Sequence, residues 1–80
     1  MNEKRNRISE NLTVEYSMKM VGEEYSLRCI AMDENGNEAD RAEVQGITPD
    51  KKRAEEILET VSLHGVTPCT LKDVIEDLLS

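Results

Sequence analysis

Two tight turns that agree on one strand register are the feature that most constrains this fold. Apolar and polar residues alternate over residues 12–20, as is typical of a half-buried strand. Gly22-Glu23 then fits a two-residue hairpin loop, and a second apolar-rich segment follows over residues 24–32. Asn35-Gly36, the strongest short hairpin signal, comes next. The chain therefore begins its folded part as consecutive hairpins.

Each turn fixes which residues face one another, so the two registers can be compared. A loop at Gly22-Glu23 places Tyr16 opposite Cys29, and a loop at Asn35-Gly36 places Cys29 opposite Ala42. Both registers put one apolar set on the same face, whereas a one-residue slip in either would mix the faces. That set is Val14, Tyr16, Met18, Met20, Tyr25, Leu27, Cys29, Ala31, Ala42 and Val44. We predict a three-stranded antiparallel meander with residues 24–32 in the centre.

Two amphipathic helices are predicted after the meander. Thr48 is a suitable N-cap for the first, Pro49 suits its first position, and His64-Gly65 marks its end. The apolar stripes are Ala54, Ile57, Leu58 and Val61 in the first helix, and Leu71, Val74, Ile75, Leu78 and Leu79 in the second. Helices and sheet each have one apolar face, so we expect an α+β fold of order β-β-β-α-α, with both helices packed on one face of the sheet.

Eighty residues are enough for one small core. We assign residues 11–80 to a single α+β domain and residues 1–10, which are polar and aperiodic, to a disordered tail. No apolar run follows the basic start, so we expect neither a signal peptide nor a membrane anchor. A cytoplasmic protein with reduced Cys29 and Cys69 is therefore predicted.

Charge and composition exclude several functions. The formal charge is −7, and residues 11–80 carry −8, which disfavours binding to nucleic acid. Two cysteines and one histidine match no standard zinc spacing, and Gly36 stands at the wrong place for a calcium loop. His64 lacks a nearby aspartate to orient it, so it is better explained as the end of a helix than as a general base. We expect no cofactor, no metal and no catalytic residue.

The exposure of the Cys69 thiol depends on where the second helix begins. If Thr67 is the N-cap, Cys69 lies in the exposed first turn, where a thiol can be activated by the helix terminus. If Thr70 is the N-cap, Asp73 supports the start and Cys69 packs against Val74. The sequence leaves both starts open.

The candidate partner surface has two parts. Ile30 and Met32 form an apolar corner on the outward face of the sheet, where Met32 is expected beside Ala39 and Thr13. The second part is the acidic face of the last helix, with Asp73, Glu76 and Asp77.

These features predict a small, non-catalytic, acidic protein-interaction module of the cytosol with an unknown protein partner. One alternative is a homodimer that associates through the sheet. The other is a thiol-dependent activity at Cys69.

The chain also resembles a family of small uncharacterised proteins from clostridial Firmicutes. The resemblance spans residues 25–79 and includes the second helix start and its acidic face. The matching residues are Tyr25, Ile47-Thr48, Val66-Thr67-Pro68, Leu71, Asp73-Val74-Ile75 and Glu76-Asp77. Thr70 departs from the pattern, because the family often has histidine at this position. The resemblance implies a bacterial cytoplasmic setting and no assigned activity.

Overall fold

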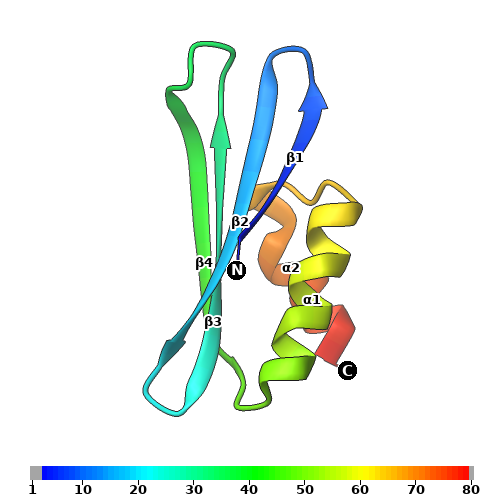
Figure 1. Ribbon diagram of the computed structural model, residues 1–80. Helices are drawn as coiled ribbons and strands as arrows, with labels where there is room; N and C mark the ends of the chain where they lie inside the picture. The colour runs from blue at the N-terminus through cyan, green and yellow to red at the C-terminus, as the bar shows by residue number, and fades with distance from the viewer. Residues whose placement is uncertain (1–2, 80) are drawn as a thin grey trace.

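The protein is a two-layer α+β domain in which two helices cover one face of an antiparallel sheet (Figure 1). The computed structural model describes residues 3–79. Its four strands lie in the order β1-β2-β3-β4, and their bounds are Glu3–Ser9, Leu12–Val21, Glu24–Met32 and Glu38–Thr48. Helices α1 and α2 span Lys51–Leu63 and Pro68–Leu79. The α+β class and the two C-terminal helices are therefore confirmed.

Both strand registers predicted from the turns are confirmed. Tyr16 of β2 lies opposite Cys29 of β3, and Cys29 lies opposite Ala42 of β4. The register of β4 shifts twice, once near each end of its pairing with β3. Near one shift, Gly46 has a φ of 65°, which favours glycine. Beyond it the strand continues to Thr48 and carries Ile47 into the core, so β4 is longer than expected.

The prediction of three strands was wrong, because the segment expected to be a tail contains β1. The sequence of β1, EKRNRIS, has one large apolar residue and lacks the alternation by which the other strands were recognised. It joins the sheet by pairing with β2, where Arg5 lies opposite Glu15. Residues 1 and 2 of the expected tail, and Ser80 of the expected domain, lie outside the described residues.

One side chain connects β1 to the helical layer. Asn6 is half-buried, and its Nδ2 donates a hydrogen bond of 2.6 Å to the carbonyl oxygen of Ser62 near the end of α1. Lys4 and Asn6 pair with the core residues Tyr16 and Val14 of β2, so both positions are on the side of the sheet that the helices cover. Backbone pairing with β2 and this polar contact thus help to hold a strand that, over residues 3–9, contributes no side chain to the buried core.

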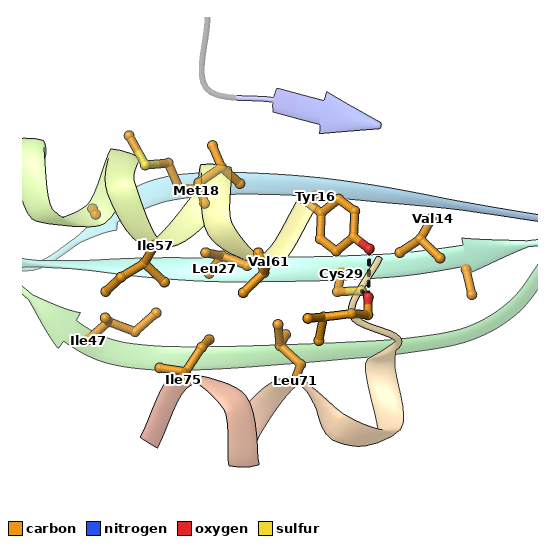
Figure 2. Close-up of a cluster of buried hydrophobic side chains, with 14 residues drawn as sticks. Val14, Tyr16, Met18, Leu27, Cys29, Ile47, Ile57, Val61, Leu71 and Ile75 are labelled. Carbon is orange, nitrogen blue, oxygen red and sulfur yellow. Dashed lines mark hydrogen bonds between the residues drawn. The ribbon is translucent and has the colours of Figure 1, made fainter. Parts of the chain in front are cut away.

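The core lies between the sheet and the helices and is almost entirely aliphatic (Figure 2). Its side chains come from β2, β3, the end of β4, both helices and their connection. The buried apolar residues are Val14, Tyr16, Met18, Leu27, Cys29, Ala31, Ile47, Ala54, Ile57, Leu58, Val61, Val66, Leu71 and Ile75. Both predicted helical stripes contribute to it, although Leu79 stays exposed.

Helix α1 begins later than expected. Asp50, not Thr48, is its N-cap, and its side chain accepts a hydrogen bond of 3.0 Å from the amide of Lys52. Thr48 ends β4 instead, and its Oγ1 accepts from the amide of Asp50 at 3.1 Å. The cap position was misassigned because the sheet extends through Ile47 and Thr48.

The connection between the helices ends α1 as the sequence predicted. His64 is the C-cap, and Gly65 follows with a φ of 62°. The amide of Val66 donates to the carbonyl of Val61 at 3.0 Å, and that of Gly65 donates to Ser62 at 3.3 Å. This pair of bonds is the Schellman arrangement, which satisfies carbonyls at the helix end.

Helix α2 begins at Pro68, so the open question about its start is resolved in favour of Thr67. Thr70 lies inside the helix, and its hydroxyl donates to the carbonyl of Thr67 at 3.2 Å. Cys69 falls in the first turn and is exposed.

Candidate functional site

The five residues of the expected partner surface lie on two separate surfaces. Ile30 and Met32 are half-buried on the sheet face opposite the helices. The three acidic residues of α2 are exposed on the helical layer, on the other side of the sheet (Figure 1). They are Asp73, Glu76 and Asp77. A single partner segment therefore cannot be assigned to all five residues.

We call the helix-free side of the sheet the outer face. Paired residues of antiparallel strands point to the same side, so the register defines its rows. One row runs Arg5, Glu15, Ile30, Arg41, the next runs Glu3, Ser17, Arg28, Glu43, and a third runs Arg7, Thr13, Met32, Glu38. Lys19 and Ser26 lie opposite one another beyond the second row.

Met32 has a different neighbour from the one predicted. The register shift between Ala31 and Met32 places Glu38, rather than Ala39, opposite Met32, while Thr13 lies on its other side as expected. Ile30 lies between Glu15 and Arg41. The apolar corner is therefore bordered by charged residues on both neighbouring strands.

Most of the arginines on the outer face have polar partners within the chain. Arg5 forms a salt bridge with Glu15, and Arg41 forms one with Glu38. Arg7 donates to the carbonyl oxygens of Ser9 and Glu10. Exposed ion pairs of this kind contribute about 0–1 kcal/mol each, so they orient side chains more than they stabilise the fold.

Arg28 is the exception on this face. Its Nε is buried and has no hydrogen-bond partner among residues 3–79. A buried donor left unsatisfied costs about 1–3 kcal/mol, which a ligand that accepts this hydrogen bond would recover. The sequence did not reveal this, because strand alternation cannot show whether a guanidinium is buried.

Arg28 lines a hollow of about 280 Å³ on the outer face. The hollow is lined by polar and apolar surface in similar proportion and carries charges of both signs. Its lining residues are Glu3, Ser17, Met18, Lys19, Ser26 and Arg28. A second hollow of about 290 Å³ lies near the other end of the face, where Met32 and Arg5 meet the β3–β4 turn. The outer face is thus uneven, with a depression on either side of Ile30.

The charges around Arg28 act on the neighbouring carboxylate. Gln45 Nε2 donates a hydrogen bond of 2.8 Å to Glu43, which lowers the pKa of that carboxyl group. The positive charges of Lys19, Arg28 and Arg41 lower the pKa of Glu43 further. Glu43 is therefore an anion at neutral pH, and this part of the face holds opposite charges side by side.

The helical side of the sheet contains a buried polar cluster of a different kind. Tyr16 Oη donates a hydrogen bond of 2.6 Å to the carbonyl oxygen of Val66, and Cys29 Sγ lies 3.7 Å from the same oxygen (Figure 2). Burial raises the pKa of Tyr16 to about 12, and the nearby Cys29 contributes. Burial also raises the pKa of Cys29 to about 12, with a contribution from Asp40. Both groups are protonated at neutral pH, so this cluster connects the sheet to the helix connection rather than supplying a nucleophile.

These raised pKa values predict a loss of stability in alkali. In the unfolded chain the thiol and the phenol ionise near their ordinary values of 9.0 and 10.0, whereas both keep their protons to about 12 in the folded protein. Above pH 9 the unfolded state therefore binds fewer protons than the native state, and the free energy of unfolding falls as pH rises. The melting temperature, measured from pH 7 to pH 11.5 in a reducing buffer, should be steady below pH 9 and decline above it.

Cys29→Ala should flatten that decline, because it removes the group with the larger pKa shift. Cys69→Ala removes the exposed thiol and is the matched control, with an unchanged pH profile expected. An alkaline decline of the same slope in Cys29→Ala and Cys69→Ala would contradict the assignment to the buried thiol.

Cys69 lies at the helix start that permits an exposed thiol. Its Sγ is 3.4 Å from Thr67 Oγ1, and this hydroxyl is also 3.3 Å from Thr70 Oγ1. Within residues 3–79 the hydrogen-bond partner of the Cys69 thiol is thus a hydroxyl group. Across the same residues, no three His, Cys, Asp or Glu side chains are grouped to hold a metal ion.

No helix within residues 3–79 is both long and apolar enough to cross a membrane.

Comparison with known proteins identifies a family without assigning an activity. A search of curated proteins and a search of solved structures each found no match. A family model described as a family of unknown function, DUF6514, matches residues 2–80. Because this match covers nearly the whole chain, the protein belongs to the DUF6514 family.

Proposed function

We propose that this protein is a small, non-catalytic interaction module of the bacterial cytosol. Its partner would be a protein segment with both apolar and acidic side chains, docked on the outer face of the sheet. The observation that carries the proposal is that this face has no covering layer in the described chain, yet it holds half-buried Ile30 and Met32. Apolar side chains bordered by polar ones are typical of docking surfaces.

Charge supports an acidic partner. Arg28 and Lys19 form no salt bridge within residues 3–79, although the face also contains arginines that are paired. A partner carboxylate would supply the missing acceptor. The depressions on either side of Ile30 would receive side chains of an extended segment.

The acidic face of α2 is less favourable as the docking surface. Asp73 and Glu76 are exposed and lie on a helix whose apolar side is buried against the sheet. Solvated carboxylates on a helix surface are the ordinary arrangement and contribute little to affinity. We assign this surface a role in keeping the protein soluble and in disfavouring nucleic acid.

The cytosolic setting is supported by the cysteines. Cys29 is buried and Cys69 is exposed, and both are free thiols. Free thiols are the usual state in a reducing compartment.

Site-specific cross-linking tests the docking surface. Benzoylphenylalanine at Met32 should form an adduct with a partner in bacterial cells, and the same probe at Glu76 of α2 should not. Ile30→Asp in the Met32 probe protein should reduce that adduct at least about tenfold, because it places a charge where the partner would cover an apolar side chain. Asp73→Asn in the same protein is the matched control and should leave the adduct unchanged.

Three outcomes would count against this function. An adduct from Glu76 but not Met32 would transfer the docking site to α2. An adduct with a second copy of the chain, together with concentration-dependent light scattering, would show a homodimer instead. Insensitivity of the Met32 adduct to Ile30→Asp would show that the contact is not specific.

A further inference from the structure

We propose that the hollow around Arg28 is a carboxylate-binding subsite, which receives an aspartate or glutamate side chain of the docked partner. This inference rests on the proposed function, because it names the group that the partner brings to the outer face. It follows from the lining of the hollow, from its charge and from one buried donor that has no partner within residues 3–79.

The donors of the hollow come from two neighbouring strands. Arg28 and Ser26 lie on β3, and Ser17 and Lys19 lie directly opposite them on β2. The close strand spacing brings a guanidinium, an ammonium and two hydroxyls around one depression. Ser26 is only 2 % exposed and its hydroxyl donates to the carbonyl of Lys19 at 3.4 Å, so Ser26 forms part of the floor of the hollow and its proton is already used within the sheet.

Arg28 differs from the other arginines of the face in having a buried, unpaired Nε among residues 3–79. Arg5 and Arg41 are each paired with a glutamate of a neighbouring position. A guanidinium presents Nε and a terminal nitrogen as a planar fork that fits the two oxygens of a carboxylate. The buried, unpaired Nε becomes half of such a fork when the guanidinium turns toward the hollow and exposes it to a carboxylate.

The charge of the hollow favours one negative charge over two. Arg28 and Lys19 supply two positive charges, while Glu3 lines the hollow and Glu43 lies opposite Arg28. A carboxylate adds a single charge to this balanced site, whereas a phosphate dianion would be repelled by both glutamates. The volume of about 280 Å³ falls just below the usual range for ligand pockets, which suits a side chain rather than a cofactor.

The subsite can be tested without the partner. The isotope-labelled full-length chain is titrated with acetate and, separately, with inorganic phosphate, and ionic strength is held constant with chloride. We expect saturable shifts of the Arg28 Nε–H signal and of the amides of Ser17 and Ser26, with tighter binding of acetate than of phosphate.

Matched variants separate the effect of the planar Arg28 guanidinium from the effect of its positive charge. Arg28→Lys keeps the charge and the aliphatic stem but loses the planar fork, so acetate affinity should fall at least about tenfold. Arg41→Lys is the control on the same face and should bind acetate like the parent chain. Glu3→Gln removes a competing carboxylate and should strengthen binding several-fold.

A peptide comparison identifies the source of the carboxylate. The capped peptide Leu-Glu-Leu should bind more tightly than acetate, and its glutamine counterpart should lose the Arg28 signal shift. Equal affinity of acetate and the peptide would point to a free small carboxylate and overturn the proposal, as would tighter binding of phosphate or no effect of Arg28→Lys.

The two proposals can fail separately. Saturable acetate binding at Arg28 without a partner adduct at Met32 would leave the anion site standing and remove the docking function. A specific Met32 adduct without acetate or peptide binding at Arg28 would keep the docking face and remove the subsite.

Discussion

Tyr16→Ala should lower the free energy of unfolding by about 3–5 kcal/mol, because it leaves a cavity where a fully buried aromatic side chain was packed. The ring of Tyr16 lies on β2 between the sheet and α1, and its hydroxyl reaches the connection between the helices (Figure 2). A protein of this size has about 4–12 kcal/mol of total stability, so the variant should lose a large share of it and unfold at a clearly lower urea concentration. Urea unfolding followed by circular dichroism measures the change.

Tyr16→Phe separates the hydrogen bond from the ring. It leaves the carbonyl of Val66 without its 2.6 Å partner and should cost about 1–3 kcal/mol. Tyr25→Phe is the matched control, because no hydrogen bond joins the Tyr25 hydroxyl to another residue of the described chain, and we expect a change within about 0.5 kcal/mol. Equal stability of the two phenylalanine variants would show that the Tyr16 hydroxyl does not stabilise the fold.

Leu71→Ala should destabilise the protein by about 2–5 kcal/mol, because Leu71 is fully buried where α2 packs on the sheet. Figure 2 shows Leu71 and Ile75 pointing from α2 toward the strands. The same substitution at Leu63, which is 76 % exposed at the end of α1, should change stability by no more than about 0.5 kcal/mol. Comparable losses at Leu71 and Leu63 in urea unfolding would contradict the packing of α2 on the sheet.

The parts of the fold that the sequence predicted are those supported by two independent signals. The register of β2, β3 and β4 followed from apolar alternation together with turn residues, and both kinds of evidence gave the same face. Gly65 marked the end of α1 because few other residues adopt its backbone conformation. The start of α2 had two candidate threonines, Thr67 and Thr70, and the local sequence signals did not decide between them.

The missed features are polar ones. Strand β1 has one large apolar residue and no apolar alternation, so a search for alternating apolar residues could not reveal it. The hollow at Arg28 was also hidden, since alternation assigns a residue to a face but does not show whether its Nε is solvated. The alternation placed Ile30 and Met32 on the correct face of the sheet. The candidate partner surface also included the acidic residues of α2, which lie on the other side of the sheet.

The order of the strands has a consequence for how quickly the chain reaches its native state. Every strand pairs with the strand next to it in sequence, and the connections between strands are short. The loop-closure entropy of forming the sheet is therefore small, because no long loop must be closed to pair two strands. Folding rates rise as contacts become more local, so the sheet should form by successive hairpins before α2 closes the core.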